Sequence, residues 1–304
     1  MLDLSIIILS FNTRKLTLEC INSLVKNSEN IKYEIIVVDN ASSDGSLKEI
    51  KKLAKKYPIV LVKNKENLGF AKANNIGIKN SKGRYILLLN SDTLIKDNVL
   101  GEMVFWMDRH KKVGVSGCSL RNRDGSVQAS GGYFPSLINF FSWMFFIDDI
   151  PFLEKIIKPF HLSHSLLPLC KDKRHFFRQR DWLTGAFFLI RKEVIESVGL
   201  LDEDYFMYTE DVDYCYRVKK MGWKIIYLPR WSIIHLGGGS ATNEFSLVSE
   251  FQGIKTFFQK NKPEWQLPII RLFLKGGALA RFFLWSVLQR KGLVKIYAKA
   301  FKIA

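Results

Sequence analysis

One carboxylate in the sequence follows directly after a strongly apolar run. Residues 85–89 are Tyr, Ile and three Leu, and Asn90, Ser91 and Asp92 come next. A carboxylate at the end of a buried strand can hold a hard divalent cation such as Mg²⁺ or Mn²⁺, which prefers oxygen ligands and is often shared with substrate phosphates. Asn, Ser and Asp are also common turn and cap residues, so the tripeptide by itself favours a plain turn.

A second acidic group lies further along the chain, where Glu210, Asp211 and Asp213 occur close together. Like-charged neighbours raise the pKa of a carboxylate, which suits it to act as a general base. The structural alternative is equally open at this point. Acids in the first turn of a helix interact favourably with its dipole, and Asp211 could be an N-cap.

A histidine, His235, follows the apolar run 231–234 and precedes the glycines of "HLGGGS". A single histidine is most often a surface residue or a hydrogen-bonded core residue. Glycines let the backbone approach an anion closely, so a histidine beside them can also contact a metal ion or a phosphate.

The elements that must position these residues alternate between strand and helix over residues 1–118. Runs and helical spacings of apolar residues predict strands at 4–9, 34–38, 59–62, 85–89 and 113–116, and helices at 13–26 (capped by Asn12 or Thr13), 46–57, 70–79 and 98–110. Continuous apolar strands between helices indicate an α/β fold with a mostly parallel, twisted sheet and helices on both faces.

Ligands of such sheets bind beyond the carboxyl ends of the parallel strands. The ends of the second, third and fourth predicted strands lead to Asp39, Asn67 and Asp92, so we expect these side chains to meet at one edge. The sequence has no G-x-G-x-x-G after its first strand and no G-x-x-x-x-G-K-[ST]. This argues against a dinucleotide oxidoreductase and a P-loop enzyme.

Beyond residue 118 the pattern is weaker. Residues 134–180 form an aromatic-rich insertion whose 140–147 cluster could be core or could line a lipid-linked acceptor site, and order returns with a strand at 181–190 and a short helix at 191–199. The cysteines have no metal-ligand spacing, which favours reduced core thiols in a cytosolic protein over a zinc site or a disulfide framework. They are Cys20, Cys118, Cys170 and Cys215.

The order of these signals resembles the family 2 glycosyltransferases, in particular their bacterial rhamnosyltransferase-like branch. The matching signals are Asp39, "NLGF" at 67–70, "NSD" at 90–92, "TGA" at 184–186, "EDVD" at 210–213 and "HLGGGS" at 235–240. The resemblance implies a GT-A fold with a catalytic domain over residues 1–240. Its nucleotide-sugar-binding half would be 1–118, its acceptor and catalytic half 119–240, and a helical tail would follow at 241–304.

The resemblance also implies an activity. Family members transfer a sugar from a nucleotide diphosphate donor with inversion, and the branch suggests rhamnose from dTDP, with uridine diphosphate sugars still open. The acceptor would be a glycan or a lipid-linked glycan in cell-surface polysaccharide synthesis. The donor would contact the following residues, with Asp39 at its pyrimidine: Ser10, Phe11, Asn12, Asp39, Asn67, Gly69, Phe70, Asn90 and Ser91.

The remaining roles that the resemblance implies concern the metal and the acceptor. Asp92 and His235 would bind Mg²⁺ or Mn²⁺, with Asn90 standing where the D-x-D-like motif has its first carboxylate. Asp211 matches the catalytic base. The acceptor would lie against Trp182, Thr184, Gly185 and Glu210.

The tail is basic. From Lys255 to the end there are eleven Lys or Arg residues and one acid, Glu264. Residues 267–288 are nearly long enough to span a bilayer, but Arg271, Lys275 and Arg281 would be costly at its centre, and helical spacing predicts that they form one polar stripe. The pattern favours an interfacial helix on an anionic membrane over one that only packs on the domain.

These features predict a cytoplasmic protein, peripheral on the inner face of the plasma membrane. The first residues indicate a strand and not a signal peptide, and the tail has no nucleic-acid-binding module. Two alternatives remain open. A nucleotidyltransferase would carry a Gly-rich basic loop after the first strand, where this chain has "SFNTRK". A non-catalytic membrane-surface protein that kept the fold would not need Asp92, Asp211 and His235.

Overall fold

The computed structural model describes residues 1–148, 150, 153–162, 177–237 and 243–304. Cys170, the last glycines of "HLGGGS" and part of the aromatic-rich insertion lie outside these residues. The cysteines that are described, Cys20, Cys118 and Cys215, are buried free thiols, as predicted.

A mixed sheet with the strand order β3-β2-β1-β4-β10-β6-β11-β5 forms the centre of the fold. Its strands are β1 (Leu2–Ser10), β2 (Tyr33–Asp39), β3 (Ile59–Lys63), β4 (Gly83–Asn90), β5 (Thr93–Leu94), β6 (Val113–Arg121), β10 (Phe187–Arg191) and β11 (Lys224–His235). β1 pairs in parallel with β2 and β4, and β6 with β11. β10 runs antiparallel between β4 and β6, so one reversed strand lies inside a mostly parallel sheet.

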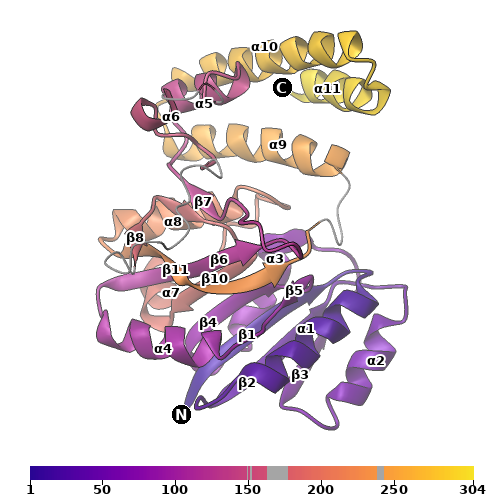
Figure 1. Cartoon of the computed structure of the whole chain (residues 1–304), viewed down its shortest axis with the longest axis vertical. Coiled ribbons are helices and arrows are strands. Elements are labelled where there is room, and N and C mark those ends of the chain that lie inside the picture. Colours follow the sequence, from indigo (N-terminus) through magenta and orange to yellow (C-terminus); the bar gives the residue numbers. More distant parts are fainter. Residues whose placement is uncertain (149, 151–152, 163–176, 238–242) are drawn as a thin grey trace.

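Helices cover both faces of this sheet, which confirms the predicted α/β class (Figure 1). Alternate residues of a strand point to opposite faces, so Ile6 and Ile8 of β1 join one core cluster and Ile7 joins the other. The covering helices are α1 (Arg14–Asn27), α2 (Ser46–Leu53) and α4 (Val99–Arg109) on the first face, and α3 (Gly69–Lys79), α7 (Lys192–Val198) and α8 (Glu210–Lys220) on the second.

Three details differ from the sequence-based expectations. Residues 181–190 form two strands, β9 (Trp182–Leu183) and β10, because Thr184-Gly185-Ala186 turn the chain between them. α1 has no side-chain cap at Thr13, and α2 ends at Leu53 instead of continuing to residue 57. The remaining short elements are β7 (Gly131–Gly132), α5 (Leu137–Met144), α6 (Leu153–Ile156) and β8 (Arg178–Gln179).

The C-terminal part forms three helices, α9 (Asn243–Asn261), α10 (Gln266–Val287) and α11 (Lys291–Ile303). α9 lies between the sheet domain and an outer layer made by α10, α11 and α5 (Figure 1). In the aromatic cluster, Phe140 and Met144 are buried but Phe141 is 39% exposed, so this segment is partly core and partly surface. None of the described helices is long and apolar enough to cross a membrane.

The prediction that Arg271, Lys275 and Arg281 form one polar stripe on α10 is wrong for Arg281. Arg271 and Lys275 are exposed, but Arg281 is buried. Its guanidinium donates to the backbone carbonyl groups of Met144 and Trp143, at the end of α5. Arg281 therefore joins α10 to α5 instead of facing solvent.

Candidate active site

The carboxyl ends of β1, β2 and β4 meet at one edge of the sheet, as predicted. Asp39, the last residue of β2, lies opposite Ser10 of β1 and is fully buried. Its Oδ2 accepts a hydrogen bond from the Ser42 backbone N–H at 3.3 Å, whereas its Oδ1 has no hydrogen-bond partner in the described structure. A buried oxygen without a donor is costly, so Asp39 fits a ligand that brings an N–H group.

Asn40, which the sequence analysis missed, organises the neighbouring loop. Its Nδ2 donates to Asn67 Oδ1 at 2.7 Å, and its Oδ1 accepts from Asn64 Nδ2 at 3.0 Å and from the Leu68 N–H at 3.1 Å. Asn67 Oδ1 also accepts from the Gly69 N–H at 3.1 Å. The Asn67 side chain thus holds the loop between β3 and α3 in shape.

Gly69 brings this loop against the segment that precedes α8. Its φ is +76°, and a Cβ at this position would lie 2.3 Å from the Phe206 carbonyl oxygen. The next residue, Phe70, donates its N–H to the same oxygen at 2.6 Å. The Phe70 ring also lies 3.1 Å from where a Cβ of Gly185 would be. Only glycine allows both this backbone conformation and this approach.

The loop after β1 is bound to the Asp39 loop. Asn12 has a left-handed φ of 54°, its Oδ1 accepts from the Ser43 N–H at 2.8 Å, and its N–H donates to Ser42 Oγ at 3.0 Å. Phe11, beside it, is partly exposed. The Ser10 hydroxyl points inward and pairs with Thr17 Oγ1 at 3.1 Å.

The candidate metal ligands lie side by side. His235, the last residue of β11, pairs with Thr93 of β5, and its Nε2 is 3.3 Å from Asp92 Oδ1. Asn90 Nδ2 is 3.4 Å from the same Nε2. Ser91 is buried, with its hydroxyl 3.2 Å from Thr13 Oγ1.

Gln128, a second residue that the sequence analysis missed, orients the His235 ring. The Gln128 amide nitrogen donates to Asn122 Oδ1 at 2.5 Å and to the His235 carbonyl at 2.8 Å. Its oxygen must then face His235 Nδ1, at 2.7 Å, and accept a hydrogen bond from it. This network assigns the ring proton to Nδ1 and leaves the Nε2 lone pair facing Asp92, as a metal-ligating histidine requires.

These residues fit Mg²⁺ or Mn²⁺ as part of a larger ligand set. No group of three or more His, Cys, Asp or Glu side chains in the described ranges is arranged to hold a metal ion. Mg²⁺ commonly takes one or two protein ligands and completes its shell with substrate phosphates and water. Asp92 and His235 match that pattern.

Asp211 lies in the first turn of α8, just after Tyr208 and Thr209, whose φ angles are 69° and 73°. Its Oδ2 accepts from the Gly185 N–H at 2.9 Å and its Oδ1 from the Val212 N–H at 2.8 Å. Burial raises the pKa of Asp211 to about 6, against the opposing effect of these N–H groups. A pKa near neutrality suits a general base. The N-cap position belongs to Thr209, so the simple N-cap role for Asp211 is wrong.

The two neighbouring acids differ from Asp211. Glu210 is buried, its Oε2 has no hydrogen-bond partner within the described residues, and burial and then the charge of Asp211 raise its pKa well above the usual value. Asp213 is structural, since it accepts from Arg217 Nε and from Asn261 Nδ2, both at 2.8 Å.

A further pair beside Asp211 had no signal in the sequence. His161 Nε2 is 2.8 Å from Glu250 Oε1 of α9, and its ring packs edge-on against Trp143, Phe160 and Trp182. The charge of His161 lowers the pKa of Asp211, as the last and smallest of several causes. Trp182 lies three residues before Gly185, which donates to Asp211, so the pair lies on the same side of the fold as the candidate base.

The expected acceptor residues lie around the same turn. Trp182 is buried, and its indole N–H donates to the Tyr133 and Phe160 carbonyl groups at 3.1 and 3.2 Å. Thr184 Oγ1 accepts from the Ala186 N–H at 3.4 Å. Trp182 is therefore part of the core next to this turn. Contact of an acceptor with Trp182, Thr184, Gly185 and Glu210 stays a prediction.

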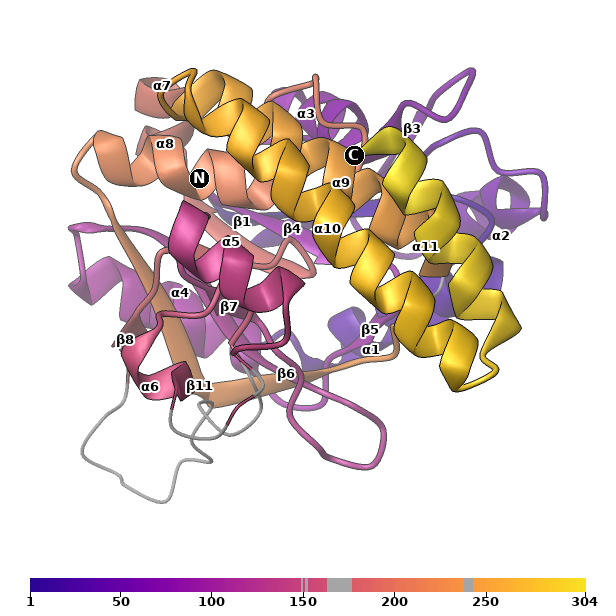
Figure 2. The same cartoon turned by 90° about the horizontal axis from the view of Figure 1, so that it is seen from above.

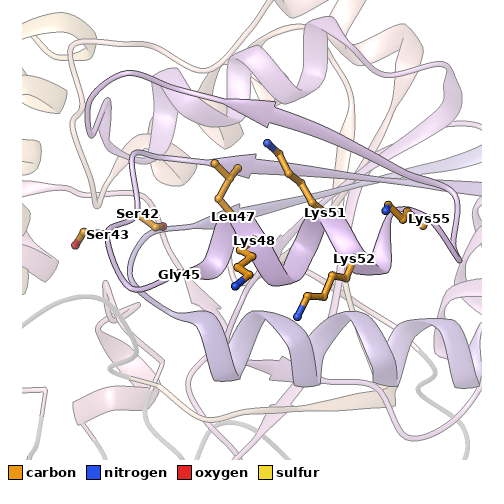
Figure 3. A pocket seen from close by; sticks show the side chains of 8 residues that line it. All are labelled: Ser42, Ser43, Gly45, Leu47, Lys48, Lys51, Lys52 and Lys55. Carbon is orange, nitrogen blue, oxygen red and sulfur yellow. The ribbon is translucent and has the colours of Figure 1, made fainter.

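An open hollow of about 570 Å³ lies against α2 and the loop that follows β2. Figure 3 shows the lysine side chains of α2, and of the segment just after it, around this hollow. None of Asp39, Asp92, Asp211 or His235 lines it, so the hollow does not define the candidate site. Its lining residues are Ser42, Ser43, Gly45, Leu47, Lys48, Lys51, Lys52 and Lys55.

Comparison with known sequences identifies relatives over most of the chain. The family model described as "Glycosyl transferase family 2" matches residues 5–199. The chain is 26% identical to the N-acetylglucosaminyl-diphospho-decaprenol L-rhamnosyltransferase of Mycobacterium tuberculosis over 263 residues, which cover 81% of each protein. It is 25% identical to rhamnosyltransferase WbbL of Escherichia coli, covering 76% of this chain and 83% of WbbL.

Solved structures with the same fold include a mannosyltransferase, PcManGT from Pyrobaculum calidifontis, in complex with GDP-Man and Mn²⁺. It has a TM-score of 0.60 at 18% identity, covering 100% of this chain and 86% of that one. GalNAc-T7 with UDP, GalNAc and Mn²⁺ has a TM-score of 0.61 at 18% identity, covering 86% and 49%. These similarities confirm the expected GT-A fold.

Proposed function

The chain belongs to glycosyl transferase family 2, and from this premise we propose that it is a metal-dependent, inverting glycosyltransferase that builds a cell-surface polysaccharide. The first candidate donor is dTDP-rhamnose, because two relatives named above are rhamnosyltransferases. The observation that carries the proposal is the hydrogen bond from Gly185 to Asp211. This bond holds Asp211, a carboxylate with a raised pKa, against the turn at Gly185. The same turn packs against Phe70 of the loop predicted to bind the donor.

On the donor side, the unsatisfied Oδ1 of Asp39 accepts the imide N–H of a pyrimidine base. Thymine and uracil both present this group, so dTDP and UDP donors fit Asp39 equally. The loops that carry Phe11, Asn12 and Asn67 enclose the nucleoside. Gly69 and Phe70 close the donor site on the side that faces the catalytic base Asp211. Asn90 and Ser91 lie beside the diphosphate.

Asp92 and His235 hold Mg²⁺ or Mn²⁺ together with the donor phosphates. When bound, the cation neutralises charge on the departing nucleoside diphosphate. Gln128 keeps the Nε2 lone pair of His235 available by accepting a hydrogen bond from the Nδ1–H group.

On the acceptor side, Asp211 removes the hydroxyl proton as the acceptor oxygen attacks the anomeric carbon. The new C–O bond forms while the bond to the donor phosphate breaks, and its electron pair leaves with the diphosphate. One displacement inverts the anomeric centre. Burial, and then the charge of Asp211, raise the pKa of Glu210 well above its usual value, which favours a neutral Glu210 beside a charged Asp211.

The acceptor is a glycan or lipid-linked glycan that lies against Thr184, Gly185 and Glu210. The name of the Mycobacterium tuberculosis relative, which specifies a diphospho-decaprenol substrate, supports the lipid-linked choice. Such an acceptor places the enzyme peripherally on the cytoplasmic face of the plasma membrane. Family membership counts against the nucleotidyltransferase alternative.

A donor screen tests this proposal. The full chain is incubated with dTDP-rhamnose or UDP-sugars, Mg²⁺ or Mn²⁺, and a short-chain lipid diphosphate sugar, and nucleoside diphosphate release is followed. We expect EDTA-sensitive release from one donor and a product of inverted configuration. Release that EDTA leaves unchanged would overturn the metal site, and a retained configuration would overturn the single displacement.

A further inference from the structure

Helix α10 is apolar on two sides. Its inward side packs Ile270, Leu274 and Ala278, all fully buried, against the rest of the chain. A helix at the surface of a soluble protein normally turns polar residues to solvent. The outward side of α10 instead exposes Phe283 by 58% and Val287 by 79%.

Further exposed apolar side chains continue this outward side. Leu272 and Leu279 precede Phe283 at helical spacing and are 67% and 43% exposed. On α5, Ile138 is 71% exposed, and the Phe141 ring lies 5.1 Å from that of Phe273. Figure 2 shows α5 beside α10 in the same outer layer. We call this set the outer apolar face: Ile138, Phe141, Leu272, Leu279, Phe283 and Val287.

The charged side chains of α10 and α11 are all Lys or Arg. No Asp or Glu follows Glu264 in the sequence. Lys275 lies in the outward row between Leu272 and Leu279, and Arg271 is exposed beside it. The exposed cations at the far end of α10 and along α11 are Arg290, Lys291, Lys295 and Lys302, whereas Lys299 pairs with Glu244 of α9 at 2.7 Å.

We propose that the outer apolar face docks on a bilayer that contains anionic phospholipid, with α5 and α10 lying in the interface and not crossing it. Apolar side chains on such helices enter the boundary of the acyl chains, while Lys and Arg pair with anionic headgroups. A second copy of the chain is a poorer occupant. A symmetric contact brings the same surface of both copies together, so these cations would face each other without acids from either α10 or α11.

The docking also orients the proposed active site. Helices α1 and α2, which belong to the half predicted to bind the nucleotide sugar, lie at the end of the molecule away from α10 (Figure 1). His161 packs on Trp143 of α5 and on Trp182, which lies three residues before Gly185, so the acceptor side is the side nearer the membrane. This inference deepens the proposed function by naming the surface on which a lipid-linked acceptor is met. Vesicle binding is measured without donor or acceptor, so the two can fail separately.

The test is co-sedimentation of the full chain with vesicles at low salt. Vesicles carry phosphatidylcholine with or without about 30% phosphatidylglycerol, which supplies the anionic surface. We expect binding to the anionic vesicles and at least about tenfold weaker binding to the neutral ones. The variant Phe283→Glu/Val287→Glu is expected to lose at least about tenfold in affinity for the anionic vesicles.

Phe105→Glu is the matched control, because Phe105 is an exposed phenylalanine on α4, far from α10 (Figure 1). It should bind as the unchanged protein does, and circular dichroism checks that both variants fold. No binding of the unchanged protein to anionic vesicles would overturn the proposal, as would equal binding by the double variant. A protein that sediments as a dimer, with only the double variant monomeric, would assign the face to a second copy.

Discussion

Asp211 and Asp213 lie two positions apart on α8 but have different surroundings. Asp213 is neutralised by Arg217 and held by Asn261, so it fixes α8 in place. Among the described residues, the hydrogen-bond donors to Asp211 are the backbone N–H groups of Gly185 and Val212. The sequence "EDVD" could not separate these roles, because the partners of Asp213 come from outside the motif.

The raised pKa of Asp211 predicts the acidic limb of the pH profile. Only the deprotonated carboxylate can accept the hydroxyl proton, so kcat/KM should fall about tenfold per pH unit below a pKa of about 6. Initial rates between about pH 4.5 and 8 measure this. A limb near the ordinary aspartate pKa of about 4 would contradict the assignment.

Gln128 gives a second prediction at this scale. Gln128→Leu removes the acceptor for His235 Nδ1 and frees the ring. Loss of such an outer hydrogen bond typically costs about 10- to 100-fold in metal affinity. We expect this shift in the Mn²⁺ concentration that gives half-maximal rate, with kcat at saturating Mn²⁺ little changed. Gln179→Leu, on exposed β8, is the control, and equal Mn²⁺ dependence of both variants would refute the role.

At the scale of elements, the site depends on how loops approach α8. Tyr208 and Thr209 hold left-handed φ angles just before Glu210, and α9 packs on them. A Cβ at Gly253 of α9 would lie 2.5 Å from Thr209 Oγ1, and the Tyr208 hydroxyl is 2.6 Å from Ser246 Oγ. α9 therefore positions the start of the catalytic helix.

Gly69→Ala tests the approach of the donor loop. Both the positive φ and the contact with the Phe206 carbonyl oppose a Cβ, so we expect a loss of about 2 to 4 kcal/mol in the free energy of unfolding. Gly222→Ala is the matched control, since Gly222 has a φ of +82° and open space around its Cβ position. It should lose only about 1 kcal/mol. Equal losses in urea unfolding would show that the approach to Phe206 does not matter.

At the scale of the whole molecule, one hydrophobic core extends across residue 240, the predicted boundary between the catalytic domain and the tail. Phe251, Ile254, Phe257 and Phe258 of α9 are buried in the cluster that includes α8. Each contributes about 1.5 to 3 kcal/mol on burial. Their sum is comparable with the stability of a whole domain, about 5 to 15 kcal/mol.

A chain that ends at residue 242 should therefore fail to fold cooperatively, whereas one that ends at residue 264 keeps α9 and should unfold in a single transition. Circular dichroism during urea titration compares them. Cooperative unfolding and donor binding by the shorter chain would show that α9 is dispensable.

The sequence predicted the parallel strands well, because continuous apolar runs between helices have few other uses. It could not show that β10 is reversed, since an apolar run carries no direction. It also placed Arg281 on a solvent-facing stripe, because helical spacing shows which residues share a face but not which face turns inward. Asp39, Asp92 and Asp211 stand at element ends, so the sequence could single them out as candidates. Gln128, His161 and Glu250 contact partners far away in the sequence, so it could not single them out.

The central claim is that Asp211 is the catalytic base of the sugar transfer and takes no part in binding the donor. The most direct measurement compares Asp211→Asn with the unchanged protein in donor binding by calorimetry and in transfer rate at saturating donor and metal. We expect similar donor affinity and a rate lower by about 10²- to 10⁴-fold. A variant that binds donor equally well and keeps a rate within about threefold of the unchanged protein would contradict the account.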